Sequence, residues 1–108
     1  MTGKPGVLTA ASGPGTLNLI TGVYTAAIDC APMVIRGGAS AVHEISRDSF
    51  QEVDQVGIMQ PLCKYWHRPT QASRYPEIVS TAYRQANSGR RGPVYIDCGA
   101  DVLYEELE

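Results

Sequence analysis

Residues 11–18 read Ala11-Ser12-Gly13-Pro14-Gly15-Thr16-Leu17-Asn18, and they separate two segments of different pattern. The preceding residues 7–11 are apolar without alternation, as in a parallel strand that is covered on both faces. The residues that follow keep a three- and four-residue rhythm, at Leu17, Ile20, Thr21, Tyr24, Ala27 and Ile28. Pro14 suits a first helical turn, where its missing N–H costs nothing. This stretch predicts a strand, a glycine turn and a helix over residues 14–30.

The rest of the chain continues the alternation of strands and helices. Residues 32–36 read as a second buried strand stopped by Gly37-Gly38, and the polar residues 39–48 as a long loop. Three further elements have the pattern of a helix or strand, at residues 63–67 (strand), 74–87 (helix) and 94–98 (strand). The fold class expected is α/β, a parallel sheet of about four strands with helices on both faces and ligand sites beyond the carboxyl ends of the strands.

Two predicted helices, over residues 49–59 and 74–87, have more detailed sequence signals. Asp48 is expected to cap a helix over residues 49–59, which Pro61 closes. In the helix over residues 74–87, six side chains are expected to face inward: Tyr75, Ile78, Val79, Ala82, Tyr83 and Ala86.

Composition excludes several classes of function. The 108 residues suffice for one domain, and nine basic against eleven acidic residues leave no basic patch for nucleic acid or an anionic membrane. No apolar stretch approaches the roughly 20 residues that span a bilayer, so a cytoplasmic protein is expected. Three cysteines without paired spacing are expected to be reduced thiols rather than a metal site.

Five separated motifs resemble the pyrimidine-binding domain of thiamin-diphosphate enzymes, such as acetolactate synthase, benzaldehyde lyase and oxalyl-CoA decarboxylase. They are residues 2–7, the turn at residues 12–18, residues 50–54, Pro61 with Lys64, and residues 92–97. The resemblance implies that residues 1–108 form a partial domain: Met1 looks like an internal start after the family's first strand and helix, and no diphosphate-binding domain follows. The implied cofactor is thiamin diphosphate, with magnesium held only by a domain absent here.

The resemblance also implies roles for particular residues. The cofactor neighbours would be Gly13, Pro14, Gly15 and Asn18. Gln51 would donate a hydrogen bond to the substrate carbonyl or developing alkoxide, and Phe50 would shape an apolar pocket beside it. Lys64 and His43 are weaker candidates for contact with substrate. Each has an ordinary alternative: a tight turn for the glycines, helix core for Phe50, and solvated side chains for Gln51 and Lys64.

Two functions remain open at this point. The first is part of a decarboxylase or carboligase acting on 2-oxo acids or acyl-CoA-type substrates, inactive as an isolated chain. The second is a non-catalytic subunit or interaction module that completes a site with another polypeptide, such as one carrying the diphosphate-binding domain. In either case self-association is expected near residues 7–11 and the helix over residues 14–29, because the family's missing strand would leave an open sheet edge there.

Arg36 does not fit the pattern of its strand. It lies in an apolar segment where an unpaired charge is costly. Three explanations are open: an acidic partner such as Asp97, an edge position for the strand, or a sequence no longer under functional demand.

Overall fold

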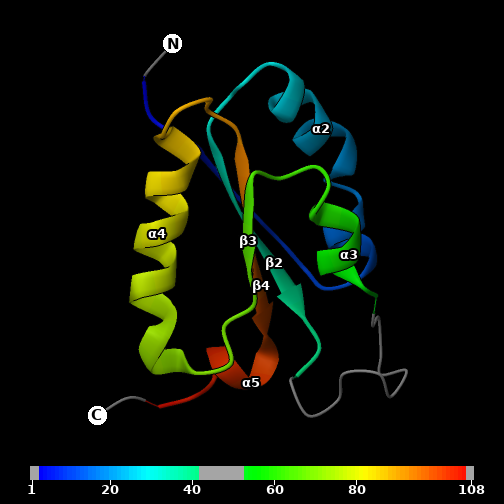
Figure 1. The fold of residues 1–108 in the computed structure, drawn as a ribbon. Helices are drawn as coiled ribbons and strands as arrows, with labels where there is room; N and C mark the ends of the chain where they lie inside the picture. Colours follow the sequence, from blue (N-terminus) through cyan, green and yellow to red (C-terminus); the bar gives the residue numbers. More distant parts are fainter. Residues whose placement is uncertain (1–2, 42–52, 107–108) are drawn as a thin grey trace.

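A computed structural model describes residues 3–41 and 53–106 and confirms the α/β class (Figure 1). Four strands form one sheet in the order β1-β2-β4-β3, and each neighbouring pair is parallel. The strands are β1 (Gly6–Ala10), β2 (Met33–Ala39), β3 (Tyr65–His67) and β4 (Pro93–Gly99). The helices are α1 (Pro14–Leu17), α2 (Ile20–Ile28), α3 (Gln55–Met59), α4 (Tyr75–Asn87) and α5 (Ala100–Leu103), with a 3-10 turn, η2 (Ala72–Arg74), before α4.

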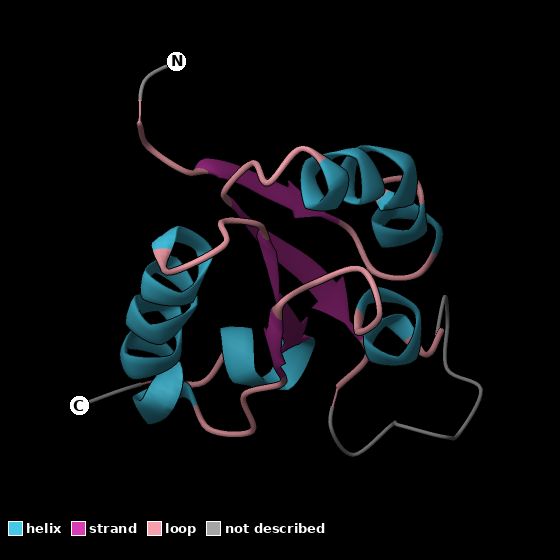
Figure 2. Cartoon of the chain, turned by 45° about the horizontal axis from the view of Figure 1, so that its top comes forward, coloured by secondary structure: helices cyan, strands magenta, loops and turns pink. Residues whose placement is uncertain are grey.

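Helices cover both faces of the sheet, as the alternation predicted. Helix α4 lies on one face, and α2 and α3 lie on the other (Figures 1 and 2). The core under α4 is made of Val34, Ile78, Ala82, Ala86, Val94, Ile96 and Cys98. The core under α2 and α3 is centred on Val23, Ile35, Met59 and Tyr95. Successive side chains of β4 enter opposite cores, so this strand is buried along its whole length.

Strand β2 is longer than predicted, because Gly37-Gly38 does not stop it. Both glycines pair with β4, Gly37 opposite Asp97 and Gly38 opposite Cys98. Glycine is needed at position 37 because an added Cβ would meet the hydroxyl of Tyr95 and lie 2.9 Å from its ring. Glycine within a strand here marks a close approach of a neighbouring group, not an end.

The helices predicted over residues 14–30 and 49–59 are shorter in the structure. The expected helix over residues 14–30 is divided into α1 and α2, because the N–H of Leu19 donates to Thr16, three residues back, and tightens the turn. Helix α3 begins only at Gln55. Its cap is Asp54, whose side chain accepts from the Gly57 N–H at 3.0 Å. The predicted cap Asp48 lies outside the described residues.

Helix α4 confirms part of its predicted inward face. Ile78, Ala82 and Ala86 are buried, and Tyr75 packs at the edge of the same core. Val79 and Tyr83 are 37% and 49% exposed, so the prediction that they face inward is wrong. The apolar stripe of α4 is therefore narrower than the sequence pattern indicated, and its main contacts are with β4, β3 and β2.

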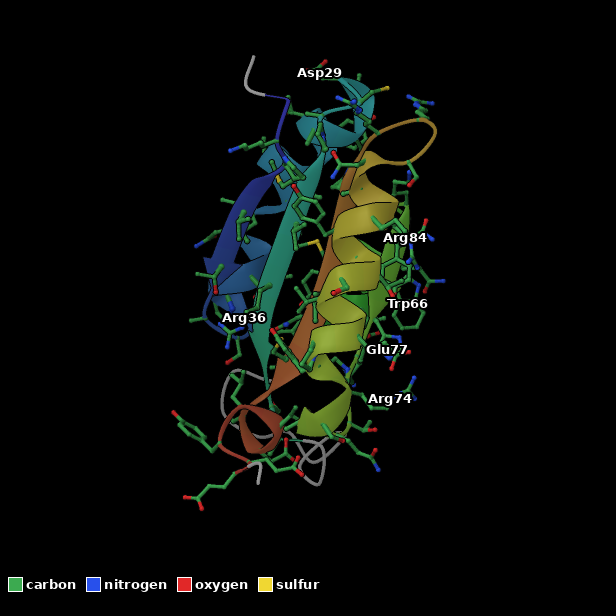
Figure 3. All side chains as sticks on the ribbon, turned by 90° about the vertical axis from the view of Figure 1, so that its left-hand side faces the viewer. Asp29, Arg36, Trp66, Arg74, Glu77 and Arg84 are labelled. Atoms are coloured by element: carbon green, nitrogen blue, oxygen red, sulfur yellow. The ribbon has the colours of Figure 1, made fainter. Side chains whose placement is uncertain are left out.

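The explanations offered for Arg36 through Asp97 or an edge position are wrong. Strand β2 is internal, and Asp97 pairs with Arg68 instead. Arg36 lies directly opposite Thr9 of β1, and its Nη1 donates to the Thr9 hydroxyl at 3.1 Å. Figure 3 shows Arg36 beside β1. The guanidinium is therefore half-buried and hydrogen-bonded.

Among the described residues, no helix has the length and apolar character needed to cross a membrane. The three cysteines are free thiols, with Cys98 buried and Cys30 and Cys63 half-buried. Burial raises the pKa of the Cys63 thiol to about 12 and raises the pKa of Cys98 as well. Both thiols therefore stay protonated near neutral pH.

Candidate functional site

The four predicted cofactor neighbours lie in one turn beyond the carboxyl end of β1. Gly13 has φ 62°, a left-handed conformation that favours glycine. Pro14 then begins α1, and the Thr16 hydroxyl donates to the Ala11 carbonyl at 2.8 Å, which closes the turn. Pro14 and Asn18 are exposed and Gly13 is buried. The turn therefore offers a small outer surface made by Pro14, Gly15 and Asn18.

The buried side of this turn is held by Gln55, the first residue of α3. The Gly13 N–H donates to Gln55 Oε1 at 2.6 Å, across 42 residues of sequence. Gln55 Nε2 lies 2.8 Å from the Gly38 carbonyl oxygen and 2.9 Å from Asp97 Oδ1. Because an N–H can only donate and a carbonyl or carboxylate can only accept, these partners leave one orientation for the amide. Gln55 is 1% exposed.

Asp97 is a fully buried acid at the centre of the same group. The Tyr95 hydroxyl donates to Asp97 Oδ1 at 2.6 Å, and Arg68 Nε donates to Oδ2 at 2.6 Å. Arg68 Nη2 lies 2.6 Å from the same oxygen. Desolvation by burial, followed by the charge of Asp97, raises the pKa of Tyr95, so its hydroxyl remains a donor. The charge of Asp97 is thus balanced by Arg68, and both carboxylate oxygens have donors.

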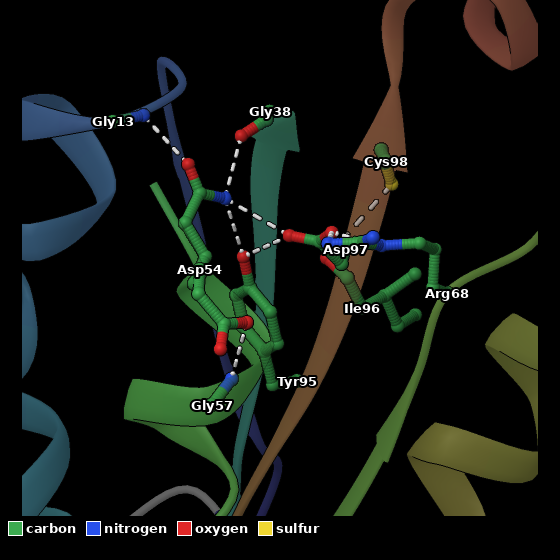
Figure 4. A network of polar contacts seen from close by, with 10 residues as sticks. Gly13, Gly38, Asp54, Gly57, Arg68, Tyr95, Ile96, Asp97 and Cys98 are labelled. Atoms are coloured by element: carbon green, nitrogen blue, oxygen red, sulfur yellow. Dashed lines mark hydrogen bonds and ion pairs between the residues drawn. The ribbon is translucent and has the colours of Figure 1, made fainter. Parts of the chain in front are cut away.

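Together these contacts cross the sheet from edge to edge. The order of the groups is Gly13 after β1, Gly38 in β2, Asp97 in β4 and Arg68 after β3 (Figure 4). The Gln55 amide bonds the first three of them. We call Gly13, Gly38, Gln55, Tyr95, Asp97 and Arg68 the transverse network. No buried side-chain nitrogen or oxygen of the described residues lacks a partner. The network therefore joins the carboxyl ends of all four strands without an unsatisfied group.

Sequence reasoning did not find Gln55, Tyr95 or Arg68 as site residues, and it gave Asp97 the wrong partner. A signal for Gln55 was present in the spacing of α3. Gln55 lies four residues before Met59, and both are buried on one side of this helix. In the sequence of this predicted helix, the apolar residues Val53, Val56 and Met59 recur every three positions, and this rhythm leaves Gln55 off the core.

Of the other predicted site residues, only Lys64 lies in the described part of the chain, and it is not near this turn. Lys64 lies at the amino end of β3, whereas the glycine turn lies beyond the carboxyl end of β1. Its ammonium donates to the carbonyls of Ser88 and Arg90, at 2.6 and 2.8 Å. This geometry gives Lys64 a structural role in the loop before β4. His43, Phe50 and Gln51 lie outside the described residues.

Comparison with known proteins identifies the family. The sequence model described as "Thiamine pyrophosphate enzyme, N-terminal TPP binding domain" matches residues 1–58. The chain belongs to this family. As a member of the thiamine pyrophosphate (thiamin diphosphate) enzyme family, it is the counterpart of an N-terminal domain, and its parallel sheet agrees with that assignment.

Its relatives include acetolactate synthases. The chain is 42% identical over 102 residues to the acetolactate synthase isozyme 3 large subunit of Escherichia coli (strain K12), covering 94% of the chain and 18% of the relative. It is 42% identical over 106 residues to the acetolactate synthase large subunit of Lactococcus lactis, covering 98% of the chain and 18% of the relative. The acetolactate synthase of Arthrospira platensis is 44% identical over 107 residues, 99% of the chain and 18% of the relative. The chain thus spans about a fifth of the length of these proteins.

The described residues of this thiamin-diphosphate family member fit one part of the cofactor better than another. Pro14, Gly15 and Asn18 would present a compact surface suited to the edge of a ring. The Gly13 N–H and the Gly38 carbonyl are already bonded to Gln55, so neither is free for a ligand. In residues 3–41 and 53–106, no group of three His, Cys, Asp or Glu side chains could hold a metal ion. The outer surface of the turn is therefore the part of this site that is open to a ligand.

Proposed function

We propose that this chain forms the pyrimidine-side and substrate-side wall of the active site in a thiamin-diphosphate-dependent decarboxylase or carboligase of the acetolactate synthase type. The observation that carries the proposal is the rigid Gly13-Pro14-Gly15 turn beyond the carboxyl end of β1, in a chain of this family. Ligands of open parallel sheets bind beyond that edge. The activity of the whole protein is part of the proposal, since the chain covers 18% of its relatives.

The turn has one role in this proposal, and Phe50 and Gln51 have another. Gly13 fixes the backbone, and Pro14, Gly15 and Asn18 border the pyrimidine ring. Gln51 donates a hydrogen bond to the oxygen on which negative charge develops, and Phe50 keeps water from the reacting carbon. The chemistry supplied by bound thiamin diphosphate is stabilisation of a carbanion next to the substrate carbonyl. Preorganised donors such as Gln51 act mainly in the transition state and so affect rate more than affinity.

The 108-residue chain by itself is proposed to be inactive. The diphosphate and its magnesium ion would be held by another domain or subunit, and the turn alone would make only a few ring contacts. Calorimetric titration of the chain with thiamin diphosphate and magnesium should show no saturable binding tighter than about 1 mM, which corresponds to roughly 4 kcal/mol. Tighter binding would show that the chain holds more of the cofactor than proposed. A cytoplasmic location is part of the same proposal.

A chimera tests the catalytic role directly. The chain would replace the matching segment of the Lactococcus lactis acetolactate synthase large subunit, to which it aligns over 106 residues. The chimera should form acetolactate from pyruvate, and Gln51→Ala in it should lower kcat about a hundredfold or more with little change in cofactor affinity. Gln71→Ala is the control, because Gln71 is exposed and its side chain caps no helix. A folded chimera with bound cofactor and no turnover would contradict the proposed role.

A second candidate is an interaction module, and β1 favours it. This strand is the outer edge of the described sheet, and Val7 on it is 73% exposed. Tyr24 and Ile28 on α2 are 54% and 57% exposed. An open strand with apolar side chains and no lysine or proline within it can pair with another chain. We therefore propose self-association or subunit contact through β1 and residues 14–29.

Sedimentation equilibrium separates this candidate from a monomeric domain. The chain should form a dimer or larger assembly, and Val7→Lys should shift it toward monomer because a charged edge resists pairing. Val79→Lys is the control, since Val79 is also a partly exposed valine but lies on α4, away from β1. A chain that stays monomeric at high concentration would exclude self-association through β1.

A further inference from the structure

One residue of the transverse network, Gln55, contacts four of its other five members. Gln55 touches Gly13, Gly38, Tyr95 and Asp97, which lie in or after three different strands. It is also the first residue of α3, so its backbone lies on a helix that packs on the sheet. A buried amide with donors and acceptors both satisfied has a single favourable placement, and any displacement leaves a buried group without a partner.

The charge of Arg68, at the far end of the transverse network from Gly13, also affects the glycine turn. Arg68 binds Asp97 Oδ2, and the Asp97 carboxylate in turn accepts from Gln55 Nε2. A charged acceptor strengthens the hydrogen bond and fixes the amide with its oxygen toward Gly13. The Gly13 N–H is therefore held by a chain of contacts that begins at Arg68, on the opposite edge of the sheet.

We propose that Gln55 is a positioning residue for the glycine turn, and that Arg68 acts on the same turn through Asp97 and Gln55. The proposal rests on the proposed function only in naming what the turn faces, the pyrimidine ring of thiamin diphosphate. Gln55 itself is 1% exposed, so its proposed role is exerted through Gly13 and not by direct contact. Its effect is to hold Gly13 in its left-handed conformation and so keep Pro14 and Asn18 in register with the carboxyl end of β2.

Amide hydrogen exchange followed by NMR tests the proposal without any ligand, so its outcome is independent of whether the chain binds thiamin diphosphate. The reporter is the Gly13 amide, and the reference is the Val23 amide, which donates to Leu19 within α2. The variants are Gln55→Met and Arg68→Met. The control is Arg74→Met, because Arg74 is an exposed arginine that makes a 3.6 Å surface pair with Glu77, seen on the outer side of α4 in Figure 3.

Gln55→Met should speed exchange at Gly13 relative to Val23 by tenfold or more. Arg68→Met should raise the ratio of the Gly13 exchange rate to the Val23 exchange rate severalfold, although Arg68 does not touch Gly13. Arg74→Met should leave this ratio unchanged. Equal changes at Gly13 and Val23 in the Arg68 variant would overturn the proposal, because they would mean a general loss of stability. If neither variant folds, the unsubstituted chain decides: exchange at Gly13 as fast as at the exposed Gly89 would also overturn it.

Discussion

The side chain of Tyr95 occupies the space in which residue 37 would carry a Cβ. A Cβ built on Gly37 would meet the Tyr95 hydroxyl, and would lie 2.9 Å from Tyr95 Cε2 and 3.0 Å from the Thr16 hydroxyl. Tyr95 is fully buried and its hydroxyl bonds Asp97, so the ring cannot move aside without breaking that contact. One missing side chain in β2 thus allows the tyrosine of β4 to reach the transverse network.

Gly37→Ala should therefore destabilise the chain by about 1–3 kcal/mol, the usual cost of adding volume to a packed interior. Urea unfolding followed by circular dichroism measures this loss. Gly22→Ala is the matched control, since an added Cβ there meets nothing within 4 Å and the residue lies in α2. That change should be neutral or stabilising by up to about 1 kcal/mol. Equal stabilities for the two variants would argue against the packing of Tyr95 over Gly37.

Gln55→Glu should make stability depend on pH. A carboxylate at this position would lie beside Asp97 and the Gly38 carbonyl, so burial and like charge would raise its pKa in the folded chain above the unfolded value of about 4.3. The introduced carboxyl group, when protonated, can still donate to Asp97, so the loss of stability should be small below about pH 4. It should grow as pH rises toward the folded pKa, by about 1.4 kcal/mol for each unit of the shift.

Thermal unfolding of the Gln55→Glu variant and the parent chain between pH 4 and 8 tests whether the loss of stability grows as pH rises. The comparison is Gln55→Met, which removes the side-chain hydrogen bonds of Gln55 and adds no titrating group. Its loss of stability relative to the parent should vary much less with pH. If the deficit of the Gln55→Glu variant stayed constant over this range, the introduced carboxylate would be solvated and position 55 would not be closed to water.

Lys64→Met should lower stability by less than about 1 kcal/mol, since Lys64 is exposed and its contacts with Ser88 and Arg90 face solvent. The loss of stability should come from loosening of the loop before β4. It is measurable as faster hydrogen exchange at the amides of residue 64 and Gly92. Lys64→Arg should restore most of the protection because it keeps a charged donor. If Lys64→Met in the chimera raised KM for pyruvate without changing loop exchange, the substrate role suggested by the sequence would be favoured instead.

Alkylation of Cys63 should be slow in the folded chain. Burial raises the pKa of this thiol from 9.0 to about 12, so its thiolate is about a thousandfold scarcer near pH 8 than for an ordinary thiol. Labelling with iodoacetamide, followed by peptide mass spectrometry, should show a rate that rises about tenfold per pH unit. The same chain in urea provides the control. Labelling of Cys63 at equal rates with and without urea would contradict its burial.

The strand and helix order could be read from the chain because it depends on local patterns. Apolar runs bounded by glycine and proline marked β1, β3 and β4, and the periodic apolar face of α4 marked the longest helix. The turn at Gly13 and Pro14 was also visible, because a positive φ and a helix start require these residue types. Family membership followed from the same motifs and is confirmed over residues 1–58.

Contacts between distant segments could not be read in this way. Gly37-Gly38 has the local character of a strand end, but both residues pair with β4, and Tyr95 lies where Gly37 would carry a side chain. Gln55 and Gly13 are 42 residues apart, and Arg68 and Asp97 are 29 apart, so no local pattern pairs them. The sequence by itself determined the order of the strands and the main helices along the chain, the glycine turn and the family. The tertiary structure alone decided which buried polar groups meet, because hydrogen-bond partners in a parallel sheet depend on strand order and not on sequence distance.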